Sequence, residues 1–169
     1  MSEQFTIIIS IIALVVSIIS AVIVYQQIRI QRQTNMLPIL IDMFKEFRSS
    51  EFKNHQQYIY NQLTQECDPS KTGYTKLPEP AKLHAITVSH FFENLGLLVA
   101  SRIIDKELVI SYMGGSIIST WNVLEPYIKQ ERIFRNGVYQ DHFEHLTALS
   151  LSHPQSQIME KLKLLKVNR

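Results

Sequence analysis

Apolar residues are concentrated in one block near the N-terminus. Residues 5–25 carry no charge, glycine or proline and are rich in isoleucine and valine. In hydrocarbon a single segment satisfies its backbone hydrogen bonds only as a helix, and about 21 residues at about 1.5 Å each span about 30 Å. Because polar residues begin at Gln26, the pattern predicts one membrane-spanning helix that ends there.

Beyond this block, apolar residues return at helical spacing, and no period-two run predicts a strand. The helices expected from this spacing lie at residues 37–47, 50–63, 83–99, 108–135, 138–151 and 154–165. The sequence therefore predicts an all-α fold, with a single N-terminal transmembrane helix followed by a cytosolic bundle of five or six helices. We expect residues 1–33 to form the anchor and juxtamembrane helix, and residues 34–169 to form the cytosolic helical domain.

Prolines and glycines interrupt this pattern. Residues 66–80 contain three prolines and one glycine and are predicted to form a mobile surface loop. Pro38 is expected to begin a new helix or to kink the first one, and Pro126 to kink or restart its helix. Gly114 and Gly115 are expected to permit a close helix crossing or a local break.

The distribution of basic residues predicts the orientation of the span. No lysine or arginine precedes it, whereas Arg29 and Arg32 follow it closely. Because cytoplasmic flanks carry the excess of lysine and arginine, we expect the N-terminus outside and the C-terminal domain in the cytoplasm, at the cell inner membrane. The basic start, short apolar core and small-residue cleavage site of a signal peptide are missing, which predicts an uncleaved anchor.

Small residues recur on one face of the predicted span. Ser10, Ala13, Ser17 and Ala21 are spaced by three and four residues. Small side chains let helix backbones approach in lipid, so this face predicts self-association, the alternative being that serine and alanine are common in solitary anchors. The span contains no ionisable group that would indicate an ion pathway.

Composition narrows the classes of protein. The chain has 169 residues, of which 46% are hydrophobic and 19% charged, so it is neither disordered nor collagen-like. A net charge of +2 is too small to predict a nucleic-acid partner by itself. A single cysteine, Cys67, excludes both an internal disulfide and a zinc site built from thiolates.

Two carboxylates lie between core-type residues. Glu93 and Glu144 each follow a phenylalanine and precede a leucine by two positions, and together they could act as acid and base or bind a metal ion. We favour the alternative that each pairs with an arginine, because an unpaired buried charge is costly. The arginines considered are Arg102, Arg132 and Arg135. Glu93, Glu144 and Trp121 are accordingly expected to have structural roles.

Histidines suggest a metal site only weakly. His142 and His145 alternate with Asp141 and Glu144 and could hold one ion with His90 or His153, but no HExxH pattern is present. Cys67 has no neighbouring histidine, and residues 114–116 lack the lysine of a phosphate loop. We therefore expect no catalytic residue, metal or cofactor, and a metal-dependent hydrolase is the minority alternative.

Basic residues supply a candidate ligand site. Arg102, Lys129, Arg132, Arg135 and Tyr139 could bind a nucleotide-type ligand by combining charge with aromatic stacking, although the aromatic spacing also suits the edge of a core. A second basic set could touch anionic lipid headgroups, and its default interpretation is a solvated helix face. That set consists of Lys161, Lys163, Lys166 and Arg169.

Several local patterns together resemble a known family. They are FFENLGLLV at residues 91–99, YMGGSIISTW at residues 112–121, Glu131 with Arg132, and YQDHFEHL at residues 139–146. The chain resembles a family of small bacterial proteins described only as a domain of unknown function, with one N-terminal membrane helix and a cytosolic helical domain. This resemblance implies an architecture and no catalytic residues. In layout alone the chain is also similar to membrane effectors of bacterial antiviral defence, including those gated by cyclic oligonucleotides.

The functional expectation follows from the architecture. We expect a membrane-anchored, self-associating helical sensor or effector that binds a cytosolic protein or a nucleotide-type ligand and acts on the lipid bilayer in antiviral defence or a stress response. The alternative belongs to another functional class and is a passive scaffold tethered to the membrane. Its anchor would only localise the helical domain beside a partner protein.

Overall fold

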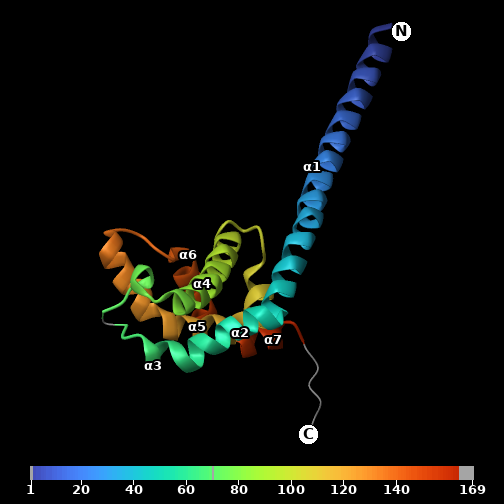
Figure 1. Ribbon diagram of the computed structural model, residues 1–169. Helices are drawn as coiled ribbons and strands as arrows, with labels where there is room; N and C mark the ends of the chain where they lie inside the picture. Colours follow the sequence, from blue (N-terminus) through green and yellow to red (C-terminus); the bar gives the residue numbers. More distant parts are fainter. Residues whose placement is uncertain (1, 70, 164–169) are drawn as a thin grey trace. The chain divides into compact units, whose positions relative to one another are not determined.

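The computed structural model describes residues 2–69 and 71–163, apart from the side chains of residues 2, 3, 5, 6 and 28–36. The described residues are helical and contain no strand, so the predicted all-α class is confirmed (Figure 1). The α-helices are α1 (Ser2–Arg48), α2 (Ser50–Tyr58), α3 (Thr64–Glu66), α4 (Glu79–Ala100), α5 (Lys106–Arg135), α6 (Asp141–Ser152) and α7 (Gln155–Lys161). A π-helix, η1 (Ile59–Leu63), joins α2 to α3, and a 3₁₀-helix, η2 (Tyr74–Lys76), precedes α4.

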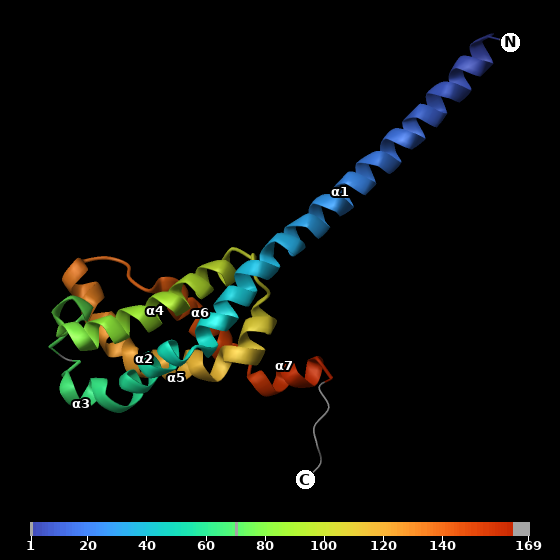
Figure 2. The ribbon, with the colours of Figure 1, turned by 45° about the vertical axis from the view of Figure 1, so that its right-hand side comes forward.

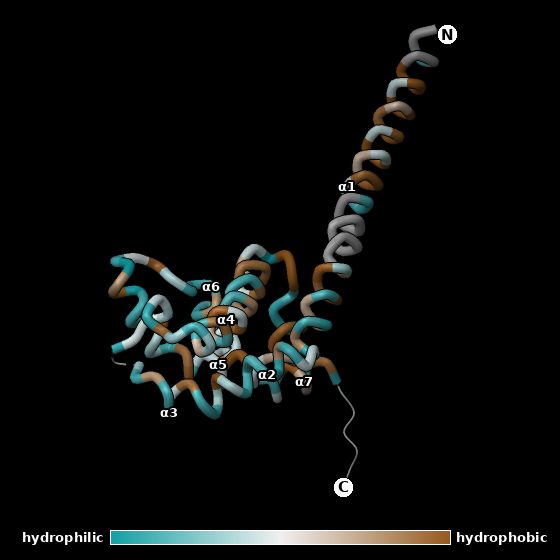
Figure 3. Tube along the Cα trace, in the orientation of Figure 1, coloured by the Kyte–Doolittle hydropathy of each residue, from teal (hydrophilic) through white to brown (hydrophobic). Residues whose placement is uncertain are grey.

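The chain forms two compact units, Met1–Met43 and Phe44–Arg169, called here the N-terminal unit and the helical unit. The N-terminal unit is the first part of α1. Its segment Ile7–Gln27 is long and apolar enough to cross a membrane, and none of that segment is buried. In Figure 3 brown, apolar residues recur along this part of α1. An apolar N-terminal helix of this kind occurs both in membrane spans and in signal sequences.

One hydroxyl group within the apolar segment forms a hydrogen bond inside its own helix. The hydroxyl of Ser20 donates to the carbonyl oxygen of Val16 at 2.8 Å, within the same helix. Helix α1 continues through Pro38 as far as Arg48, so this proline begins no new helix. The predicted orientation depends on Arg29 and Arg32, whose side chains lie outside the described part of the structure. Lys166 and Arg169 lie wholly outside the described residues.

The helical unit has α4 at its centre (Figure 2). Helix α4 packs against α2 on one side and α6 on another, and α5 packs against both α6 and α7. Aromatic rings fill the α2–α4–α6 contact: Phe52 lies 4.6 Å from Phe91, and Phe92 stacks on Phe143 at 5.1 Å, measured between ring centroids. Helix α4 is also apolar and long enough to cross a membrane, but much of it is buried in this core.

Helix α5 differs from its sequence-based description. It runs without restarting through Pro126, because the loss of one N–H group is offset by neighbours such as Tyr127 and Leu124 that are fully buried. Gly115 makes no close crossing, since a Cβ atom placed there would meet nothing within 4 Å. The close crossing occurs at Gly96 of α4, where a Cβ atom would lie 2.2 Å from the carbonyl oxygen of His142.

The segment predicted as a mobile surface loop packs partly into the core. Tyr74 and Leu77 are buried, and a Cβ atom on Gly73 would lie 2.7 Å from a carboxylate oxygen of Glu131. The segment therefore follows the surface of α5 closely. Pro69, Gly73 and Pro78 lie in irregular backbone, whereas Pro80 lies in the first turn of α4.

The two glycines allow a matched prediction. Gly96→Ala should destabilise the helical unit by about 1–3 kcal/mol, because the added methyl group meets the α6 backbone and α4 must shift. Gly115→Ala should stabilise it by up to about 1 kcal/mol, because alanine is the better helix former and the space is open. Thermal unfolding followed by circular dichroism measures both, and equal melting temperatures for the two variants would contradict the close α4–α6 crossing.

Candidate functional site

The candidate site is built around the first turn of α6. The residue before this helix, Gln140, adopts a left-handed conformation with φ of 59° and makes no side-chain capping bond. The first backbone N–H groups of a helix have no partner within it and usually need such a cap. An acceptor from another part of the chain must therefore satisfy the start of α6.

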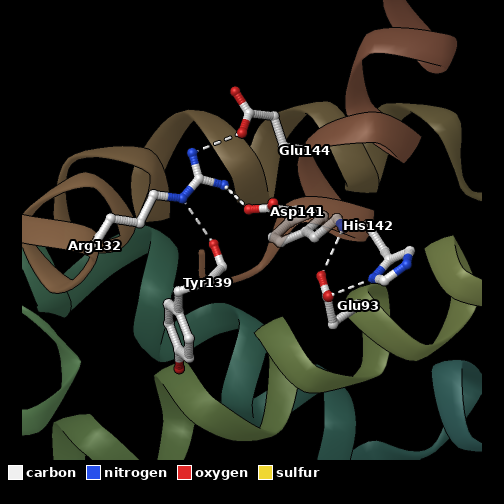
Figure 4. Close-up of polar contacts among 7 residues, drawn as sticks. Glu93, Arg132, Tyr139, Asp141, His142 and Glu144 are labelled. Atoms are coloured by element: carbon white, nitrogen blue, oxygen red, sulfur yellow. Dashed lines mark hydrogen bonds and ion pairs between the residues drawn. The ribbon is translucent and has the colours of Figure 1, made fainter. Parts of the chain in front are cut away.

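Glu93 of α4 supplies that acceptor (Figure 4). One carboxylate oxygen accepts the backbone N–H of Phe143 at 2.8 Å, and the other contacts Nδ1 of His142 at 2.8 Å. A carboxylate at a helix N-terminus also interacts favourably with the partial positive charge of the helix dipole. The nearby Gly96 lets α4 come close enough for this contact. Glu93 is thus an N-cap provided by a different helix.

Arg132 joins the end of α5 to the same turn of α6. Its Nε atom donates to the carbonyl oxygen of Tyr139 at 2.8 Å, and its two terminal nitrogens pair with Asp141 at 2.9 Å and with Glu144 at 2.7 Å (Figure 4). Each guanidinium nitrogen therefore has a partner in the protein. We call Glu93, Arg132, Tyr139, Asp141, His142 and Glu144 the polar cluster.

A buried carboxylate lies beside this cluster. Glu131 is fully buried and accepts the amide N–H of Thr75 at 2.9 Å and the Nε of Arg135 at 2.6 Å. Burial alone would raise the pKa of Glu131, but hydrogen bonds from the Thr75 hydroxyl and amide and from Arg135 outweigh it and lower the pKa below its usual value. The Arg135 guanidinium also lies 4.4 Å above the Tyr139 ring, a cation–π contact.

An open surface pocket of about 330 Å³ lies over the polar cluster. It is lined by His90, Glu93, Val138, Tyr139, Gln140, Asp141 and His142. Gln140 is buried and its amide nitrogen donates to Ser89 at 3.3 Å. Among the described buried atoms, Oε1 of Gln140 and the hydroxyl of Tyr74 have no hydrogen-bond partner. A small ligand in this pocket would therefore meet both carboxylate and imidazole groups.

The structure brings together only part of the predicted ligand site. Arg132, Arg135 and Tyr139 are neighbours, whereas Lys129 pairs with Glu125 at 2.9 Å. Arg102 lies before the start of α5 and Arg132 lies near its end, and the helix rises about 39 Å over the roughly 26 residues from Lys106 to Arg132. The turns before and after α5 lie at opposite ends of the bundle in Figures 1 and 2. Because both clustered arginines pair with carboxylates, little positive charge remains for an anionic ligand.

The predicted structural residues have definite partners. Glu144 pairs with an arginine as expected, whereas Glu93 binds the start of α6 instead. Trp121 is buried and meets Phe143 edge-on, with ring centroids 5.1 Å apart. Of the basic terminal set, Lys161 pairs with Glu107. The membrane-helix residues Ser10, Ala13, Ser17 and Ala21 are all exposed on α1.

The candidate metal ligands do not converge in the described residues. His142 turns to Glu93, His153 contacts Nζ of Lys106 at 3.0 Å, and His145 is exposed. No group of three or more histidine, cysteine, aspartate or glutamate side chains in the described ranges could hold an ion. The arrangement can cap a helix and pair charges, and we derive no chemical step from it.

One constellation was missed by sequence reasoning. His55 and His84 lie 29 residues apart, and their Nδ1 atoms are 2.7 Å from one another. No spacing or flanking pattern marks them, because α2 and α4 meet only through tertiary packing. The contact between Thr75 and Glu131, which are 56 residues apart, likewise has no marker in the sequence.

These features define an all-helical protein in which an apolar N-terminal helix precedes a bundle centred on α4. Residues 7–151 match the family described as a domain of unknown function, DUF4760, and the chain belongs to this family. The match includes the apolar helix and the whole polar cluster. The expected relation to a family of unknown function is confirmed. Comparisons with curated proteins and with solved structures give no match.

The capping role of Glu93 can be tested with a matched pair of substitutions. Glu93→Gln should lower the free energy of unfolding by about 1–2 kcal/mol, because it removes the charge at the start of α6 and weakens two hydrogen bonds. Glu125→Gln, in an exposed ion pair with Lys129, should change it by less than about 0.5 kcal/mol. Chemical denaturation measures both values, and comparable losses in the two variants would argue against the capping role.

Proposed function

We propose that this protein is a non-enzymatic bacterial membrane protein, anchored in the inner membrane by Ile7–Gln27, which self-associates and uses its helical unit to sense a cytosolic protein or ligand. The observation that carries this proposal is the fully exposed apolar segment of α1. A row of isoleucine and valine side chains exposed in this way is stable only when lipid or another apolar surface covers it.

The continuity of α1 supports an uncleaved anchor over a signal sequence. The same helix that carries the apolar segment ends with Phe44 and Phe47, whose rings contact Tyr112 at 5.0 Å and Phe91 at 6.1 Å in the helical unit. Removal of the apolar segment would cut within this helix. The basic residues Arg29 and Arg32 favour a cytoplasmic location for everything that follows.

The small residues of α1 support self-association. Ala13, Ser17 and Ala21 lie four residues apart and are exposed, so a second α1 helix can approach this face closely. Association in the membrane and partner binding by the helical unit would then be linked through one helix. This arrangement suits an effector that perturbs the bilayer in antiviral defence or under stress.

The association face gives a direct test. Replacing Ala13, Ser17 and Ala21 together by leucine should reduce crosslinked dimer in membranes several-fold, because leucine keeps the two backbones apart. Any toxicity on overexpression should fall in parallel. Replacing Val15, Ile19 and Val22 by leucine, on the opposite face, is the matched control and should leave crosslinking unchanged. Undiminished crosslinking in the first variant would remove the basis for the association face.

A second experiment separates an effector from a passive scaffold. The segment Ile7–Gln27 is exchanged for an unrelated single span of equal length, and growth under overexpression is compared with that of cells expressing the original chain. An effector should lose its activity, because its output depends on this particular span, whereas a scaffold should retain it. Fractionation must place both proteins in the membrane pellet, and recovery of the original chain in the soluble fraction would contradict the anchor itself.

A further inference from the structure

A pair of histidines lies between α2 and α4, away from the polar cluster. The Nδ1 atoms of His55 and His84 are 2.7 Å apart, and the ring centroids are 4.8 Å apart. Both side chains are partly buried. The ring of Tyr58 stacks on His84 with 4.2 Å between centroids, so the His84 imidazole is fixed between two neighbours.

The separation of the two nitrogens limits how many protons the pair can hold. A neutral imidazole has one donor and one acceptor nitrogen, whereas a protonated imidazole has two donors. At 2.7 Å one Nδ1 must donate and the other must accept, which neutral and singly protonated pairs can both achieve. In a doubly protonated pair two N–H groups and two positive charges would face each other. That state is incompatible with the observed contact.

We propose that His55 and His84 form an acid-sensitive latch, closed while at most one proton is added to the pair and opened when both imidazoles become charged. This device goes beyond the proposed function and does not depend on it. Histidine is the side chain whose ordinary titration falls nearest to cytoplasmic pH, so acidification below neutral pH supplies the protons that open the latch.

The surroundings of the latch contain little that would compensate a second charge. Glu66 is the carboxylate that acts on His84, and it already accepts the hydroxyl of Tyr58. Burial first, and then the Glu66 carboxylate, raise the pKa of Tyr58 to about 12, so the stacked phenol stays neutral. The other charged or titratable groups on α2, η1, η2 and α4 are Glu51, Lys53, Tyr60, Tyr74, Lys76, Glu79, Lys82, His90 and Glu93. Of these, Glu93 binds the start of α6 instead. Glu79 pairs with Lys82, and Lys76 lies over the Phe134 ring.

The direction of the pH effect follows from His84. Burial and then the proximity of His55 lower the pKa of His84, and the Glu66 carboxylate opposes them only in part. The open state, with an ordinary imidazole, therefore binds more protons than the closed state just below the usual histidine value. Because protons then favour the open state, the closed contact loses stability as the pH falls through this window.

The latch controls the helix that follows α1. Helix α2 begins at Ser50, capped by the Ser49 hydroxyl, which accepts the N–H of Phe52 at 3.1 Å. Phe52 holds α2 on α4 through its contact with Phe91. Phe52 also contacts Phe92, with ring centroids 6.2 Å apart, so aromatic contacts still join α2 to α4 when the histidine contact is lost. Acid thus acts on the part of the helical unit nearest in sequence to the apolar helix.

Hydrogen exchange on the full-length chain in a mild detergent tests the latch. Between about pH 7.5 and about pH 5.5, after correction for intrinsic exchange, protection of the α2 amides should fall about tenfold in the unmodified protein. In His84→Gln and His55→Gln the fall should be less than about threefold, because glutamine can hydrogen-bond but does not titrate in this range. His145→Gln, at an exposed histidine of α6, should behave as the unmodified protein.

Two outcomes would overturn the latch. One is an unchanged α2 protection over this pH range in the unmodified protein, and the other is an undiminished fall in both glutamine variants.

Should the variants fail to fold, NMR titration of the unmodified chain tests the latch instead. The titrations of the two rings should then be coupled, with shifts in the α2 amides as the second proton is added. A single, independent titration of both rings would exclude the coupled pair.

Discussion

The carboxylate of Glu93 on the first turn of α6 is the contact from which the polar architecture of the helical unit follows. Because α6 begins with an uncapped Gln140, its N-terminus is stable only where another helix presents an acceptor. Glu93 does so, and Gly96 allows the two backbones to approach. With α6 fixed in this position, Asp141 and Glu144 come within reach of Arg132. The ion pairs of the cluster are thus a consequence of the cap.

Charge pairing explains why residues that suggest a ligand site in sequence have a different role in the fold. Arg132 pairs with the half-exposed carboxylates of Asp141 and Glu144, and Arg135 supplies the positive charge beside Glu131, which is fully buried. An arginine that holds two helices together is not available to a phosphate unless those contacts break. Ligand binding at the pocket beside Tyr139 would therefore use carboxylates and imidazoles first.

The sequence predicted the class of fold and most helices because apolar periodicity is local, whereas contacts between helices are not. Pro126 illustrates one limit: its effect depends on whether buried neighbours hold the helix together, which composition does not show. Glycines illustrate another, since Gly96 and Gly115 are both helical and only the first lies at a crossing. His55 and His84 had no pattern to identify them, because their contact exists only once α2 lies on α4.

Helix α4 makes one histidine contact with α2 and another with α6. On the α6 side, the Glu93 carboxylate contacts Nδ1 of His142 and also accepts the backbone N–H of Phe143. On the α2 side, a second proton on His55 and His84 sets two like charges against each other, so acid weakens that contact. The two contacts therefore differ in kind, because only the contact with α2 places two imidazole nitrogens against each other. A fall in pH would weaken this one contact of α2 while the rings of Phe52 and Phe91 stay packed and Glu93 still caps α6, which is how a local titration can alter one element without unfolding the unit.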